Sequence, residues 1–127
     1  MSNKITDNSP VDIHLVLTIR WYNEIEAGRK RYECREQSDY YKSRFLGNYK
    51  VLKGMHADKN TPWLYLYKNI RSIIFHKGYT KTTMRYECEG IRVGYGKLYW
   101  GAPYHPVFII SLGRRMRQCF NVSKFHH

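Results

Sequence analysis

The chain has 127 residues, a length typical of one domain, and 43% of them are hydrophobic, which excludes compositional disorder. Its 22 Lys and Arg residues against 10 Asp and Glu give a formal charge of +12, so the whole molecule attracts polyanions such as nucleic acid. No apolar run reaches the length of a membrane span, and three cysteines without zinc-type spacing indicate reduced thiols in a cytoplasmic setting, with no metal and no cofactor.

The first third of the chain predicts an arm, a strand, a helix and a second strand. Residues 1–12 are polar and fit a flexible N-terminal arm. Residues 14–19 are apolar and β-prone, as in a buried strand. The period then changes to that of a short helix over 20–27, which Gly28 is suited to end. Residues 31–36 alternate, as in a half-buried strand.

The remainder of the chain predicts further strands. The stretch 37–62 is polar and tyrosine-rich, and a surface loop is expected at 54–62. Its residues Tyr40, Tyr41, Phe45 and Leu46 fit one or two amphipathic turns but give no definite element. Strands are expected at 72–75, at 83–93 and, as the clearest apolar run, at 107–112. Short strands, one early helix and a late apolar strand predict an α+β fold, in which a mixed sheet of about five or six strands curls toward a barrel.

These elements predict one domain over 13–113. It is preceded by the arm at 1–12 and followed by a basic C-terminal tail at 114–127. The arginines at the start of that tail either extend a track for phosphates or belong to a frayed end.

The segment 28–35 concentrates charged residues next to the end of the helix. Lys30 stands at the mouth of the following strand, and Glu33 and Arg35, two apart, project from one face of it. Glu33 can hold either cation by a charge-assisted hydrogen bond, and an anion can compete for the same cations. A partly desolvated Glu33 can also take up a proton. The plain alternative is an exposed ion pair, worth at most about 1 kcal/mol.

A second group of candidates lies later in the chain. Lys77, Tyr79 and Lys81 belong to a polar, basic turn that can meet a phosphate, although a solvated hairpin tip has the same composition. Trp100 can stack on a base for about 1–3 kcal/mol, or fill the core. His105, between two prolines, is a candidate general base beside the cleft.

Several of these motifs together resemble a known family. Gly28-x-Lys30-x-x-Glu33-x-Arg35, directly after a short strand and helix, resembles the signature of the ASCH domain. The preceding Trp21-Tyr22-x-x-Ile25 resembles the helix of that family. Three later segments are similar to an ASCH branch of bacteria and their phages: Phe75-x-Lys77-Gly78-Tyr79, Trp100-Gly101-Ala102-Pro103 and the stretch 107–113. The resemblance covers about 13–113 and implies a PUA-like β-barrel with a cleft beside the first helix.

The resemblance also implies a set of activities. Family members are proposed to bind RNA in that cleft, some are reported to cleave RNA, and one bacterial branch is an amidohydrolase acting on acetylated cytidine. In that branch a Lys matching Lys30 works with a Thr at the position of Glu33. Because this chain has Glu33 there, the hydroxyl nucleophile is missing.

We therefore expect a binding module that uses a basic cleft around the motif Gly28-x-Lys30-x-x-Glu33-x-Arg35 to hold RNA or a nucleotide-like ligand, without a membrane partner. Its expected contacts with the ligand are Lys30, Arg35, Lys77, Tyr79, Lys81 and Trp100. The alternative is a hydrolase, a ribonuclease or a modified-nucleoside amidohydrolase, in which Lys30 and Glu33 act as acid and base. A third possibility is an inhibitor of the phage type that binds a protein partner, because tyrosine-rich surfaces suit protein interfaces.

Overall fold

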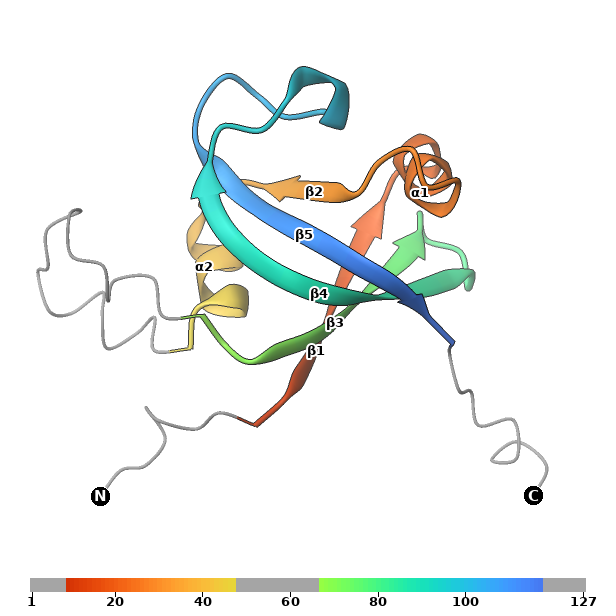
Figure 1. Cartoon of the computed structure of the whole chain (residues 1–127), viewed down its shortest axis with the longest axis horizontal. Helices are drawn as coiled ribbons and strands as arrows, with labels where there is room; N and C mark the ends of the chain where they lie inside the picture. The colour runs from red at the N-terminus through yellow and green to blue at the C-terminus, as the bar shows by residue number, and fades with distance from the viewer. Residues whose placement is uncertain (1–8, 48–66, 118–127) are drawn as a thin grey trace, which may run out of the picture.

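The computed structural model describes residues 9–47 and 67–117, which form a small α+β unit (Figure 1). A mixed five-stranded sheet curls into a half-barrel, as the sequence predicts at this level, and is accompanied by two α-helices, of which the sequence predicted only the first. In chain order the elements are β1 (Val11–Leu17), α1 (Ile19–Glu26), β2 (Tyr32–Arg35), α2 (Asp39–Phe45), β3 (Ile70–Lys77), β4 (Thr83–Gly94), the short 3-10 helix η3 (Leu98–Trp100) and β5 (Val107–Met116).

The strand order β1-β3-β4-β5-β2 places β1 and β2 at the two edges of the sheet. Among the described strands only β1 and β3 run parallel, and the chain between them passes through α1, β2 and α2, since parallel strands cannot share a tight hairpin. The long strand β4 changes register twice between Tyr86 and Gly90, and such irregularities increase the twist of a strand. The resulting curl brings the edges together, so that Arg35 of β2 donates to the main-chain oxygen of Val16 in β1 at 2.9 Å.

The core lies inside the curl. Alternate residues of β1 (Ile13, Leu15 and Leu17) are buried against α1 and β3, as the period of a half-buried strand requires. Strand β5 is different, because all of its first four residues are buried. Phe108 and Ile110 join the main core, whereas Val107 and Ile109 join a second cluster with Trp100. Burial on both faces explains why β5 gave the clearest apolar run.

Helix α2 lies in the polar stretch for which the sequence predicted no element. It begins at Ser38, whose Oγ accepts a hydrogen bond from the Tyr41 amide at 3.2 Å. Phe45, one turn after Tyr41, is completely buried and stacks near it, with ring centroids 5.7 Å apart. One buried aromatic is enough to dock a helix of seven residues, but it leaves a weak pattern in the sequence.

The boundaries of the strands also differ from the predicted ones. Pairing with β3 starts β1 at Val11, inside the predicted arm, and pairing with β4 carries β5 through Met116, past the predicted domain end at 113. Strand β3 continues to Lys77, so the expected turn at 76–81 is shorter. Backbone hydrogen bonds extend these strands where side-chain polarity suggested loops. The predicted loop at 54–62 lies outside the described residues. In the described part of the chain, no helix has the length and apolar character needed to span a membrane.

Candidate functional site

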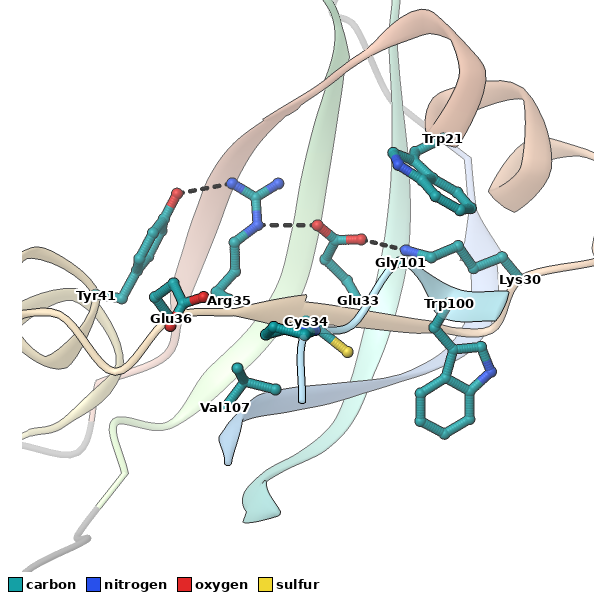
Figure 2. A pocket seen from close by; sticks show the side chains of 11 residues that line it. Trp21, Lys30, Glu33, Cys34, Arg35, Glu36, Tyr41, Trp100, Gly101 and Val107 are labelled. Carbon is teal, nitrogen blue, oxygen red and sulfur yellow. Dashed lines mark hydrogen bonds and ion pairs between the residues drawn. The ribbon is translucent and has the colours of Figure 1, made fainter. Parts of the chain in front are cut away.

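A cleft of about 370 Å³ opens between α1, β2, α2 and the connection from β4 to β5 (Figure 2). It is lined by Trp21, Lys30, Glu33, Cys34, Arg35, Glu36, Tyr41, Trp100, Gly101, Pro103 and Val107. Lys30, Glu33 and Arg35 therefore share one hollow, which is the arrangement that the spacing of the segment 28–35 predicts.

These three side chains form a continuous row of alternating charges. Lys30 Nζ lies 2.5 Å from Glu33 Oε1, and Arg35 Nε donates to Glu33 Oε2 at 2.9 Å. Arg35 Nη1 donates further to the Tyr41 hydroxyl at 2.7 Å, so the row crosses the cleft as Figure 2 shows. Lys30 and Glu33 are only 4% and 6% exposed. The pair is therefore a buried one, in contrast to the exposed pair that the sequence left open.

Local backbone structure sets these positions. Gly28, with φ of +81°, ends α1 in the left-handed region, and the amide of Lys30 then donates to the carbonyl of Glu24 at 3.2 Å. Strand β2 follows at once and pairs antiparallel with β5, with Glu33 opposite Ile110. The side chain of Lys30 thus comes from the turn, and those of Glu33 and Arg35 from one face of β2.

Aromatic side chains form two walls of the cleft. Trp21 of α1 is half-buried, and its ring centroid lies 5.1 Å from Lys30 Nζ and 4.5 Å from Arg20 Cζ. Trp100 is 8% exposed and stacks on Tyr32 with ring centroids 4.3 Å apart. Because Trp21 is half-buried and Trp100 is almost fully buried, Trp21 is the better placed of the two to stack on a ligand.

The lining of the cleft is balanced in charge. It holds two cations, Lys30 and Arg35, and two carboxylates, Glu33 and Glu36. The cleft was expected to be basic, but its described lining residues carry no net formal charge, although the molecule as a whole carries +12. Glu36 Oε1 lies 2.6 Å from His105 Nε2, which puts His105 at the rim.

Cys34 lies in the wall but is a poor nucleophile. Burial raises the pKa of its thiol, and the nearby Glu33 carboxylate raises it further. The thiolate is therefore disfavoured. Within residues 9–47 and 67–117, no group of three or more His, Cys, Asp or Glu side chains could hold a metal ion.

The second predicted group lies elsewhere. Lys77, at the end of β3, has its Nζ 5.5 Å from the ring centroid of Tyr22. Tyr79 is 97% exposed in the turn before β4, and Lys81 is exposed in the same turn. None of the three lines the cleft. They lie at the end of β3 and in the turn between β3 and β4.

The lining residues that were absent from the predicted contacts include Trp21, Glu36 and Tyr41. Trp21 and Ile25 are four residues apart and share one face of α1, but of the two only Ile25 is fully buried. Tyr41 belongs to helix α2, which the sequence did not define, and its spacing from Phe45 was the available signal.

Comparisons of the chain with models of protein families, with curated proteins and with solved structures found no match. The functional argument therefore depends on the geometry and the charge of the site itself.

Proposed function

We propose that this chain is an RNA- or nucleotide-binding domain of the PUA-like, ASCH kind, and that its cleft receives a nucleobase. The observation that carries the proposal is the buried row Lys30–Glu33–Arg35 beside the half-buried ring of Trp21. A hollow of about 370 Å³ is in the range of small-ligand pockets, and its aromatic wall and few converging polar groups are typical of them.

The chemistry of a base edge suits this lining. Bases present hydrogen-bond donors and acceptors side by side, and the cleft offers cationic donors from Lys30 and Arg35 beside carboxylate acceptors on Glu33 and Glu36. A charge-balanced lining favours an uncharged ring over a phosphate. Stacking on Trp21 would add about 1–3 kcal/mol.

The test is calorimetric titration of the protein with the four ribonucleosides, their monophosphates and short RNA. Trp21→Ala should weaken binding by about 5- to 150-fold, the equivalent of the lost stacking. Tyr79→Ala is the matched control, because Tyr79 is almost fully exposed and lies outside the cleft. The proposal fails if the wild-type protein binds none of these ligands, or if both variants bind as the wild type does.

A second candidate function is hydrolysis of RNA or of an acylated nucleoside. It is favoured by the short, buried contact between Lys30 Nζ and Glu33 Oε1, because an ammonium and a carboxylate held together in a cleft can act as acid and base. Incubation of end-labelled RNA and of acetylated cytidine with the wild-type protein separates the two functions. Intact ligands indicate a binding module, and time-dependent products indicate a hydrolase.

A further inference from the structure

A second hollow, of about 360 Å³, lies at the other end of α1. It is bounded by the last turn of α1, the turn into β2, Tyr86 of β4 and the end of β5. Its charged lining residues are Glu26, Lys30, Arg31, Arg114 and Arg115. Among the described residues, four cations and one carboxylate line this hollow, whereas two of each line the cleft. Lys30 is already paired with Glu33, so the excess of positive charge in the hollow comes from the arginines.

Arg31 supplies a cation that is fixed in place. Its Nη2 donates to the main-chain oxygens of Leu112 at 3.1 Å and of Gly113 at 3.3 Å. Among the described residues, no carboxylate lies within ion-pair distance of this guanidinium. The charge of Arg31 is therefore oriented by the backbone of β5 and is not neutralised by a neighbouring acid.

The two arginines of β5 add to this field. Arg115 Nη1 is 3.7 Å from Glu26 Oε2, a long contact between exposed groups. Arg114 pairs with Glu87 at 3.2 Å and is also exposed. Ion pairs of this kind contribute about 0–1 kcal/mol, so a phosphate can replace the carboxylates at little cost.

Lys30 lines both the cleft and the hollow, so the two sites adjoin at this residue. A ligand with an uncharged ring next to a negatively charged linkage would occupy both at once. The nucleotide unit of a nucleic-acid strand has that composition, and guanidinium groups fork onto its phosphate oxygens.

We propose that the hollow is a phosphate subsite, and that the ligand is an RNA strand whose backbone passes from the cleft over Lys30 to Arg31 and Arg115. This inference rests on the proposed function, because it takes the cleft as the site of the base. A strand then binds more tightly than a free nucleoside, and the difference comes from the hollow.

The experiment compares ribonucleosides with tetranucleotides, and wild-type protein with Arg115→Gln and Arg31→Gln. We expect tetranucleotides to bind at least about tenfold more tightly than nucleosides, with a salt dependence of about 0.7 in log–log slope per phosphate contacted. Each variant should lose about tenfold in affinity for tetranucleotides and leave nucleoside affinity unchanged. Lys42→Gln on α2 removes the same charge, lies outside both hollows and is the matched control.

The possible failures are distinguishable. Equal affinity for nucleosides and tetranucleotides, with no effect of either arginine variant, overturns the phosphate subsite and leaves the base site standing. If binding depends on the arginines but is unchanged in Trp21→Ala, the base site is overturned. A third outcome is that polyglutamate binds more tightly than RNA and depends on the same arginines. That result overturns both the RNA strand and the base site, and it assigns the hollow to an acidic protein. Thermal unfolding of each variant checks that it folds, and Arg31→Gln retains a donor for the carbonyls of β5.

Discussion

Glu33 contacts two cations at once, Lys30 through one oxygen and Arg35 through the other. The side chains of Lys30 and Glu33 are 4% and 8% exposed, so water cannot replace a missing partner. Removal of one member of a buried pair leaves a desolvated charge, which costs more than the pair itself contributes. Residue 33 therefore determines stability as well as the chemistry of the cleft.

We predict that Glu33→Gln lowers the free energy of unfolding by about 3–5 kcal/mol, measured by urea denaturation. The double variant Lys30→Met/Glu33→Leu removes both buried charges and should be more stable than the single variant. A Glu33→Gln protein within 1 kcal/mol of the wild type would mean that the pair is effectively solvated.

Among the elements, the connection between β4 and β5 controls the shape of the cleft. Trp100 of η3 is packed into the second cluster, and Gly101 directly after it has φ of +83°. A Cβ on Gly101 would lie 2.8 Å from Cζ2 of Trp21. Glycine is thus required at this position for two reasons: the positive φ of the backbone and the close approach of the Trp21 indole.

We predict that Gly101→Ala destabilises the protein by about 1–2 kcal/mol and also weakens nucleoside binding, because the Trp21 ring must move. Gly78→Ala is the control: Gly78 also has a positive φ, +56°, but its added Cβ would have no neighbour within 4 Å. Thermal melting should show a loss in both variants, and calorimetry should show weaker binding in Gly101→Ala alone. Unchanged binding in Gly101→Ala would separate Trp21 from ligand recognition.

Elements with a helical period, an alternation or a continuous apolar run were the ones that the sequence could predict. Helix α1 follows from its period, β4 from alternation, and the cores of β1, β3 and β5 from apolar runs. The grouping of Lys30, Glu33 and Arg35 follows from Gly28 and the alternation along β2. Helix α2, the strand ends and the second hollow could not be predicted in this way. Each depends on partners distant in the chain, such as Phe108 against Phe45 or Leu112 against Arg31.

For the molecule as a whole, the excess of positive charge opposes further protonation. Burial lowers the pKa of His14, and the neighbouring His76 and Arg44 lower it further, although Asp12 acts in the opposite direction. His14 Nδ1 lies 2.8 Å from His76 Nε2 across β1 and β3. Asp12 is held differently: hydrogen bonds from Arg71 lower its pKa to about 2.

We predict that stability falls as the pH decreases below about 6.5. The unfolded chain takes up a proton on His14 more readily than the folded one, so the stabilisation is complete above the unfolded pKa and is lost as the pH falls toward the lower folded pKa. His14→Gln should flatten the stability profile between pH 7 and pH 5. Asp12 stays ionised over this range, and its contribution is lost only as the pH falls from about 4 toward 2. A profile that keeps its slope in His14→Gln would assign the effect to other groups.

The bond from Arg35 to the carbonyl of Val16 has a consequence for how this molecule can diversify. The same guanidinium fastens the two edges of the sheet and faces the cleft, so a replacement at position 35 alters recognition and closure together. Trp21 and Glu36 line the cleft, but within the described residues neither of them joins the two edges of the sheet. New ligand preferences would therefore arise more readily by substitution at positions 21 and 36 than at position 35. The arginine that joins the two edges of the sheet would be retained while other residues in the wall of the cleft change.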